Sequence, residues 1–282
     1  MRDEQKIAAS DSGAELIPVL MSLWCYSLLL IWTLLGILAF PFAFSLCLLF
    51  LRWPTDQLMR WFIWLYGRGW LLLMSPFVQF RREQMQQIEV GKPCLFVVNH
   101  LSFFDTYCMA LLPVHDITFA VRSWPFRIFW YGGFMRLAGY LDVEGSRWVK
   151  TLRNCRRTFA AGGTVLFFPE GHRSRDGQLQ RFHSGAFKAA ISAGVSLIPL
   201  CIDGTDQLLP PGRKLLHPCR IKLRALAPID TREFVEVDGH VRLRKLVKGQ
   251  MAKALEEMRT LDGAVDGLQE IHGRADEENP AG

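Results

Sequence analysis

Between Leu16 and Leu51 the chain carries no charged residue, over 36 consecutive positions. As a single helix this stretch would be about 54 Å long, whereas the hydrocarbon core of a bilayer is about 30 Å thick. Pro41 lies inside it, and a proline bends or breaks a helix. We therefore predict two apolar membrane helices here, either a hairpin or one helix followed by an interfacial one, rather than one straight span.

The charges around this stretch predict an orientation. Arginines follow it at positions 52, 60, 68, 81 and 82, whereas Arg2 and Lys6 before it are offset by four acidic residues. The positive-inside rule then predicts an inner (cytoplasmic) membrane with the chain after residue 52 facing the cytoplasm. Residues 53–80 mix tryptophans with sparse arginines, which predicts a helix at the headgroup level; the alternative is a core helix of the following domain.

After Pro93 the chain carries short continuous apolar runs with helical stretches between them. Such runs, without alternation, are typical of strands buried on both faces of a parallel sheet. We predict an α/β fold with a mostly parallel central sheet flanked by helices, preceded by the N-terminal hydrophobic membrane helices. The predicted strands are Cys94–Val98, Ile117–Val121, Thr164–Phe168, Ser196–Ile202 and Ile221–Leu226, and the predicted helices are Ser102–Leu112, Phe126–Ala138, Trp148–Ala161, Ser184–Ala193 and Val241–Leu261.

The expected organisation has four parts: a polar segment 1–15, membrane-anchoring helices 16–80, an α/β domain 81–261 and an acidic tail 262–282, predicted to be disordered. The net charge is +6 overall and −5 in the tail, which leaves +11 for the rest. A body this basic suits an anionic membrane surface or phosphate-bearing ligands. Nucleic acid is the competing partner, against which the apolar N-terminus argues. Seven cysteines without a CxxC pair favour reduced, mostly buried thiols.

The first candidate motif is NHLSFFD, residues 99–105, directly after the strand that ends at Val98. Ser102 and Asp105 have the spacing of a helix-capping pair, which would place Asp105 in the first helical turn. His100 would then lie in a strand-to-helix loop, where α/β proteins place ligands, and Asp105 could orient its ring. By itself a histidine near an aspartate is more often structural than catalytic.

The second candidate motif is FPEGHRS, residues 168–174, at the end of another predicted strand. Arg173 offers a planar fork for a phosphate, and Gly171 lets the backbone approach a ligand closely. A solvated turn with a surface ion pair is the alternative. The remaining histidines show no metal-ligand spacing, so no metal site is predicted.

Together these two motifs resemble the His-x4-Asp and Glu-Gly-x-Arg motifs of the glycerolipid acyltransferase family, of the 1-acylglycerol-3-phosphate acyltransferase type. Further segments agree, and the similarity extends from about Phe77 to Thr231. The resemblance implies a membrane-bound enzyme that moves a fatty acyl chain from acyl-CoA or acyl-carrier protein to a lysophospholipid hydroxyl. The favoured acceptor is 1-acylglycerol-3-phosphate, which would give phosphatidic acid. No bound cofactor is implied.

The family mechanism gives each motif residue a role. His100, oriented by Asp105, would remove the proton of the acceptor hydroxyl as it attacks the thioester. Backbone N–H groups near Gly171 or at the start of the helix from Ser102 would hold the oxyanion. Phosphate would be bound by Arg173 with Arg122 and Arg147, and Glu170 would orient Arg173 or its loop. The resemblance thus assigns His100 and Asp105 to catalysis, and Glu170, Gly171, Arg173, Arg122 and Arg147 to substrate binding.

The chain departs from the family at His172, where the Glu-Gly-x-Arg motif usually has a small or hydroxyl residue, and in the second family motif. Where the second family motif usually ends in Ile-Asp-Arg, it has Val143-Glu144-Gly145, followed by Ser146 and Arg147. Either Arg147 substitutes from a shifted position, or the acceptor lacks the phosphate beside the free hydroxyl. Alternatives to the leading function are an acyltransferase for a different lysolipid or non-phosphate acceptor, a non-catalytic lipid-binding protein of the same fold, and a lipid hydrolase.

Overall fold

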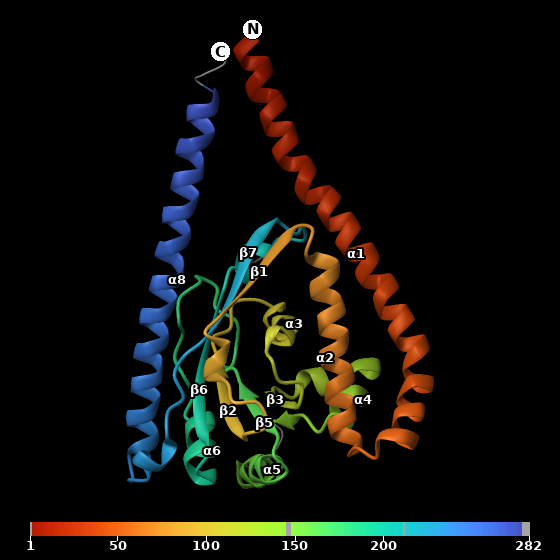
Figure 1. Cartoon of the computed structure of the whole chain (residues 1–282), viewed down its shortest axis with the longest axis vertical. Coiled ribbons are helices and arrows are strands. Elements are labelled where there is room, and N and C mark those ends of the chain that lie inside the picture. The colour runs from red at the N-terminus through yellow and green to blue at the C-terminus, as the bar shows by residue number, and fades with distance from the viewer. Residues whose placement is uncertain (1, 145–147, 211, 278–282) are drawn as a thin grey trace.

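The structure, a computed structural model, describes residues 2–144, 148–210 and 212–277 (Figure 1). In these residues seven strands form one sheet in the order β1-β7-β6-β2-β5-β3-β4. All neighbouring pairs are parallel except β6 and β7. The strands are β1 (Val78–Glu83), β2 (Cys94–Val98), β3 (Ile117–Val121), β4 (Leu141–Asp142), β5 (Thr164–Phe167), β6 (Ser196–Asp203) and β7 (Cys219–Ala225). The predicted mostly parallel sheet is confirmed. It also contains two strands that were not predicted, β1 and β4, at its two edges.

Helices cover both faces of the sheet. Alternation along β2 divides the core, because Phe96 and Val98 pack towards α1–α3 whereas Leu95 and Val97 pack towards α5, α6 and α8. The helices are α1 (Arg2–Leu51), α2 (Thr55–Met74), α3 (Asp105–Cys108), α4 (Phe129–Leu137), α5 (Trp148–Ala160), α6 (Gly185–Ala193), α7 (Thr205–Leu208) and α8 (Gly239–Glu277), with short 3₁₀ turns η1 (Met85–Gln87), η2 (Met109–Leu111), η3 (Trp124–Arg127) and η4 (Thr231–Phe234).

The prediction of two helices between residues 16 and 51 is wrong, because α1 is one continuous helix with Pro41 inside it. Side chains on both sides of the proline pack against the same neighbour: the rings of Phe40 and Phe44 lie 5.5 and 5.9 Å from that of Phe62 on α2. Packing that continues across the proline opposes a break there. The turn comes instead at Arg52, whose φ is +50°, just before Pro54.

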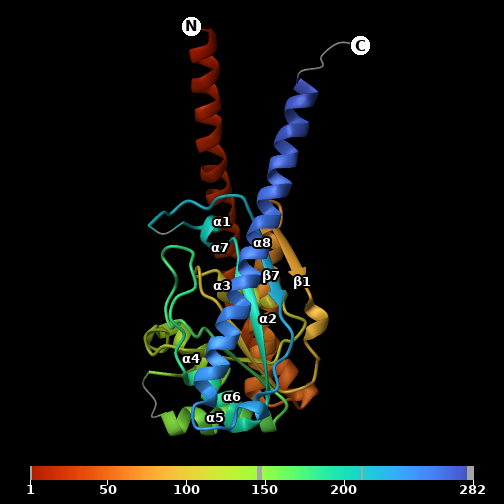
Figure 2. The ribbon, with the colours of Figure 1, turned by 90° about the vertical axis from the view of Figure 1, so that its left-hand side faces the viewer.

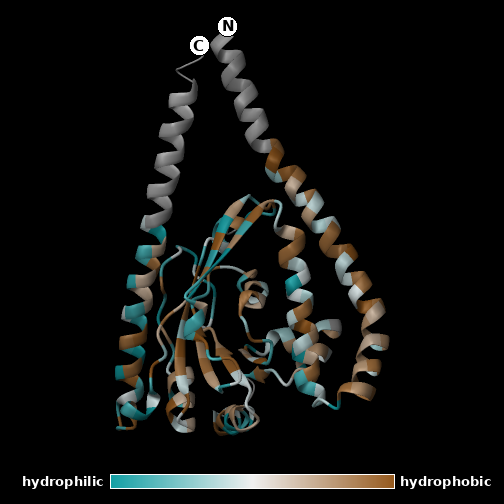
Figure 3. Ribbon diagram, in the orientation of Figure 1, coloured by the Kyte–Doolittle hydropathy of each residue, from teal (hydrophilic) through white to brown (hydrophobic). Residues whose placement is uncertain are grey.

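The apolar part of α1, Leu16–Leu51, is long and apolar enough to cross a membrane. Figure 3 shows it as a largely brown helix running beside the domain. Contacts with the domain occur along its length. The Ser22 hydroxyl accepts a hydrogen bond from the Leu216 N–H (2.7 Å), the Tyr26 hydroxyl donates to the Lys214 carbonyl (2.8 Å), and Phe40 packs against Phe134 of α4.

Of the two structures predicted for residues 53–80, a headgroup-level helix and a core helix, the second is found: α2 is a core helix of the domain. Its buried side chains include Leu58, Trp70 and Met74, and Trp70 stacks on Phe104 with ring centroids 5.1 Å apart. Packing against the sheet thus outweighs the interfacial composition of this segment. The strand β1 begins at Val78, three residues before the expected domain boundary at 81.

At the other end of the chain, α8 runs from Gly239 to Glu277 and thus extends through most of segment 262–282, for which we expected a disordered tail. Residues 278–282 lie outside the described residues. Figure 1 shows α8 along the side of the sheet opposite to α1 and α2.

Candidate active site

The candidate site begins where β2 ends, at Asn99. The side chain of Asn99 continues the strand pairing: its amide donates to the Ile202 carbonyl and its oxygen accepts the Ile202 N–H, both at 2.8 Å. This pair of hydrogen bonds fixes the end of β2 to β6. As a consequence, residues 100–105, which follow β2, lie next to residues 204–206, which follow β6.

Asp105 is fully buried and is held by four hydrogen bonds. Its Oδ2 accepts the backbone N–H groups of Leu101 (2.7 Å) and Ser102 (2.9 Å) and contacts Nδ1 of His100, while its Oδ1 accepts the hydroxyl of Thr205. Asp105 lies in the first turn of α3, as predicted, but the predicted cap at Ser102 is wrong, because α3 begins only at Asp105 and no side chain caps it. Asp105 instead closes the loop on itself and is thereby fixed for contact with His100.

His100 is oriented by contacts on two sides. Its Nδ1 lies 2.7 Å from Asp105 Oδ2, and its ring stacks on Phe168 with centroids 4.4 Å apart. With Asp105 accepting the proton of Nδ1, the second ring nitrogen Nε2 carries a lone pair and can act as a base. The side chain is 18% exposed, so the ring is reachable from outside.

Glu170 ties the second motif to the first. Its carboxylate is buried and accepts two backbone N–H groups at 2.9 Å, that of His100 on Oε1 and that of Gln180 on Oε2. Burial raises the pKa of Glu170, and these two hydrogen bonds oppose the rise. Since both oxygens are engaged by the backbone, Glu170 positions the two loops; no bond to Arg173 was found among the described residues.

Gly171 and Arg173 follow on the same loop. Gly171 has φ +74°, and a Cβ there would lie 3.2 Å from the ring of His183, so the position favours glycine. The loop is fixed to the first motif by the Ser174 N–H, which donates to the His100 carbonyl at 2.7 Å. The side chain of Arg173 is exposed.

Arg122 follows β3 and is paired with the residue that breaks the family pattern. Its Nε donates to Glu144 Oε1 at 2.6 Å, and the other oxygen of Glu144 accepts the Ser123 N–H at 3.0 Å. The Ser123 hydrogen bond and the Arg122 guanidinium lower the pKa of Glu144. Arg147 lies outside the described residues. In the structure, Arg122 therefore faces a carboxylate.

The expected oxyanion donors are largely engaged elsewhere. The N–H groups of Leu101 and Ser102 donate to Asp105, and that of Gly171 donates to the Phe168 carbonyl at 3.1 Å. These three groups are therefore not available to a developing oxyanion in this conformation. The expectation of backbone donors near these two loops stays a prediction for their other N–H groups.

A cavity of about 480 Å³ lies between α1, α2, α4 and β3. Its wall is mostly apolar and includes Trp32 and Phe40 of α1, Tyr66 of α2 and Phe134 of α4. Thr106 and Tyr107 line it as well, so the cavity extends to α3, the helix that begins with Asp105. Its size and lining are those of a site for an apolar ligand.

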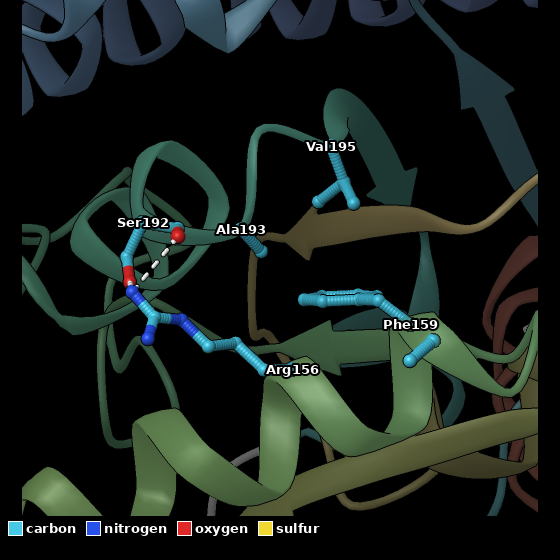
Figure 4. A pocket seen from close by; sticks show the side chains of 6 residues that line it. Arg156, Phe159, Ser192, Ala193 and Val195 are labelled. Carbon is cyan, nitrogen blue, oxygen red and sulfur yellow. Dashed lines mark hydrogen bonds between the residues drawn. The ribbon is translucent and has the colours of Figure 1, made fainter.

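A second hollow lies away from these residues. Figure 4 shows it between the end of α5 and the end of α6, where Arg156 donates to the Ser192 hydroxyl (2.6 Å) and carbonyl (3.1 Å). Val195 lies beside it just before β6, at the edge of the sheet where the parallel strands begin, whereas His100 follows a strand end. No group of His, Cys, Asp and Glu able to hold a metal ion was found in the described residues.

Thr205 is the site residue that sequence reasoning missed. It lies 100 positions from Asp105 and has no motif around it, so no sequence signal links the two. The sequence-assigned residues at 100, 105, 170, 171 and 173 are brought together by the adjacent strands β2 and β5. Arg122 follows β3, the next strand in the sheet.

Comparison with known proteins agrees with this geometry. A family model described as Acyltransferase matches residues 78–203, from the start of β1 to the end of β6. A 1-acyl-sn-glycerol-3-phosphate acyltransferase of Chlamydomonas reinhardtii is 37% identical over 144 residues, which are 49% of this chain and 43% of that protein. One from Limnanthes douglasii is 23% identical over 83% of this chain and 84% of its own length.

Among solved structures, that of the 1-acyl-sn-glycerophosphate acyltransferase PlsC from Thermotoga maritima has the same fold, with a TM-score of 0.72 at 23% identity over 87% of this chain and 98% of that one. The relative from Chlamydomonas reinhardtii and two similar chloroplastic ones, from Arabidopsis thaliana and Brassica napus, are matched over only about two fifths of their own lengths. The family resemblance drawn from the motifs is confirmed.

Proposed function

We propose that this chain, which belongs to the acyltransferase family through residues 78–203, transfers a fatty acyl group from an acyl thioester to the hydroxyl of 1-acylglycerol-3-phosphate, giving phosphatidic acid. The observation that carries the proposal is the ring of His100, fixed by Asp105 through Nδ1 and still partly exposed. A base needs this arrangement, in which one nitrogen is oriented and the other is free to take a proton.

The geometry supports a direct transfer without a covalent enzyme intermediate. Nε2 of His100 takes the proton of the acceptor hydroxyl while the hydroxyl oxygen attacks the thioester carbonyl carbon. The tetrahedral intermediate then collapses: the C–S bond breaks, and the leaving thiolate takes the proton from the imidazolium. Asp105 stabilises the imidazolium between these two steps, as a buried carboxylate 2.7 Å away can.

Substrate phosphates would be bound by Arg173 and Arg122, with Arg147 as a third candidate. Arg173 is exposed on the loop that Ser174 fixes to His100, within the same edge of the sheet. Gly171 leaves room for close approach of the substrate to that loop, and Glu170 holds it in place. A donor that carries phosphates, acyl-CoA or acyl-carrier protein, and a phosphate-bearing acceptor both fit these cations.

An acyl chain would occupy the cavity between α1, α2 and α4. The wall is apolar, and each buried CH₂ group of a chain contributes about 0.8 kcal/mol. Because Thr106 and Tyr107 line the cavity next to Asp105, the chain's carbonyl end could reach the imidazole.

The partner surface is a bilayer, on which α1 would lie rather than cross. Contacts at Ser22, Tyr26 and Phe40 hold the apolar part of α1 along the domain, so the helix cannot extend away from it without losing them. The outer side of α1 is apolar and suits the acyl boundary of one leaflet. The charge distribution favours the inner membrane with the catalytic domain facing the cytoplasm.

The test is a labelled acyl-thioester assay with the full chain in lipid vesicles, against lysolipids with and without a phosphate next to the free hydroxyl. Acyl-CoA and acyl-carrier protein are compared as donors. We expect phosphatidic acid as product with the wild type, and loss of transfer in His100→Ala and Asp105→Asn. His240→Ala on α8, which removes a histidine remote from the site, serves as the control and should keep wild-type activity.

Three results would contradict the proposal. Normal turnover in folded His100→Ala protein excludes His100 as the base. Free fatty acid as the sole product, with lysolipid present, indicates a hydrolase. Lipid binding without thioester consumption indicates a non-catalytic lipid-binding protein.

A further inference from the structure

Large apolar side chains are exposed on the segment after β3, which forms η3 and α4. Phe129, the first residue of α4, is 99% exposed, Trp124 of η3 is 57% exposed, and Leu137 at the end of α4 is exposed as well. Arg127 and Arg136 lie exposed among them. We call these five residues the α4 patch. Exposed aromatic and aliphatic groups next to basic ones are typical of segments that contact a membrane surface.

The α4 patch is a rigid feature of the fold. Arg136 Nη2 donates to the Phe126 carbonyl at 2.8 Å, which ties α4 back to η3. Gly132 lies so close to the same carbonyl that an added Cβ would be 2.3 Å from it. Within α4, Gly132 and Met135 are buried. The exposure of Phe129 is therefore imposed by packing on the other side of the helix.

The helix that carries most of the α4 patch packs against α1. Phe134 of α4 packs against Phe40 of α1 with ring centroids 5.3 Å apart. Beyond this contact the exposed side chains of α1 are large and apolar, among them Phe42 and Leu46. In Figure 2, α4 protrudes on the left-hand side, away from α8. A bilayer that covers the outer side of α1 at this level would thus also reach α4.

We infer that the α4 patch is a second membrane contact, in which Phe129 and Trp124 enter the headgroup–acyl boundary and Arg127 and Arg136 face anionic lipid headgroups. Only Ser123 separates Arg122, which follows β3, from Trp124 of this contact, so the contact brings the candidate site to the leaflet that supplies its acceptor. It goes beyond the proposed function, which requires a bilayer at α1 only, and it does not depend on catalysis.

The charges of the α4 patch favour lipid over an acidic protein partner or a second copy of the chain. Glu144, the acidic side chain bonded to neighbouring Ser123, is already paired with Arg122. The patch thus combines exposed apolar side chains with two exposed arginines, a combination that matches an anionic bilayer. A second copy of this basic chain would bring arginines against arginines.

The test measures the depth of a fluorescent label in the full chain. Phe129→Cys is labelled with a polarity-sensitive fluorophore, in a background with Cys47→Ser and Cys219→Ser because the other native cysteines are buried. The labelled protein is reconstituted into vesicles of phosphatidylcholine with phosphatidylglycerol. Quenching by nitroxide-bearing lipid is compared with quenching by iodide in the water. Val237→Cys, at a position 94% exposed next to α8 on the other side of the molecule, is the matched control.

We expect the label at 129 to be quenched severalfold more by nitroxide lipid than the label at 237, and severalfold less by iodide. Arg127→Glu should move the label at 129 towards the iodide-accessible state, with the largest change in vesicles rich in phosphatidylglycerol. Iodide quenching at 129 equal to that at 237 would overturn the inference. Protection at 129 from both quenchers would overturn it as well, since it indicates a protein partner. Because the readout is label depth, an inactive protein with a deep label refutes only the proposed function.

Discussion

The hydroxyl of Thr205 offers the sharpest test of how the candidate base is held. Thr205 and Asp105 are both fully buried, and the Thr205 hydroxyl donates to Asp105 Oδ1, the oxygen that does not contact His100. Replacement by valine keeps the shape of the side chain and removes only this donor. One oxygen of a buried carboxylate is then left without a partner.

The expected loss follows from the charge on the acceptor. A hydrogen bond to a charged group contributes about 1.5–3 kcal/mol, so Thr205→Val should lower the free energy of unfolding by about that amount. For a protein of this size the melting temperature would fall by about 3–12 °C. If the imidazolium relies fully on this carboxylate in the transition state, kcat would fall by up to about 10- to 150-fold.

Thr118 provides a matched control. It too is fully buried, on β3, but its hydroxyl has no hydrogen-bond partner among the described residues. Thr118→Val should therefore leave stability unchanged or raise it, and should leave kcat unchanged. Thr205→Ser, which restores the donor, should recover most of the rate. Thermal unfolding and the acyl-thioester assay measure both quantities, and wild-type kcat in Thr205→Val would refute the positioning role of Thr205.

Two further predictions concern the acidic residues of the site. Glu144→Gln removes the charge that pairs with Arg122 at 2.6 Å, so KM for phosphate-bearing acceptors should fall a few-fold with kcat unchanged. Arg122→Gln should raise this KM. An unchanged KM in both variants would exclude Arg122 from acceptor binding. Burial raises the pKa of Glu170, so the carboxyl group binds its proton more tightly in the folded chain than in the unfolded chain. The protonated group therefore contributes stability below the ordinary glutamate pKa of about 4.3, and this contribution is lost as the pH rises through the raised pKa. The melting temperature of the wild type relative to Glu170→Gln should therefore decrease as the pH rises through this window, and a constant difference would contradict the burial effect.

Much of the fold could be predicted from local sequence. The apolar runs at 94–98 and 117–121 are strands with these bounds, because residues buried on both faces leave a continuous pattern. The motifs at 99–105 and 168–174 could be placed at strand ends, which parallel pairing brings to one edge of the sheet. β1 could not be predicted, since Arg81 and Arg82 give it the composition of an exposed segment although it pairs with β7 over its length.

The details of the site depended on contacts between distant residues. The capping pair at Ser102 had the right spacing, but the Asp105 carboxylate is bonded instead to the loop before it and to Thr205, the first residue of α7. The pairing of Arg122 with Glu144 joins the ends of β3 and β4, whose adjacency only the sheet order gives. Pro41 likewise predicts a break from local rules alone, and the packing of Phe40 and Phe44 on α2 overrides it.

The two buried carboxylates of the site divide one task between them. Asp105 binds the ring of His100, and Glu170 binds its backbone N–H, so the histidine is held at both ends. Placing two acids near one imidazole is costly, and the charge of Asp105 adds to the burial that raises the pKa of Glu170. Both Glu170 oxygens accept backbone N–H groups, which stabilises its charge and ties it to the two loops. The mechanism that we propose therefore uses one base: Glu170 positions the backbone of His100, and His100, whose Nδ1 is bonded to Asp105, takes the proton on Nε2.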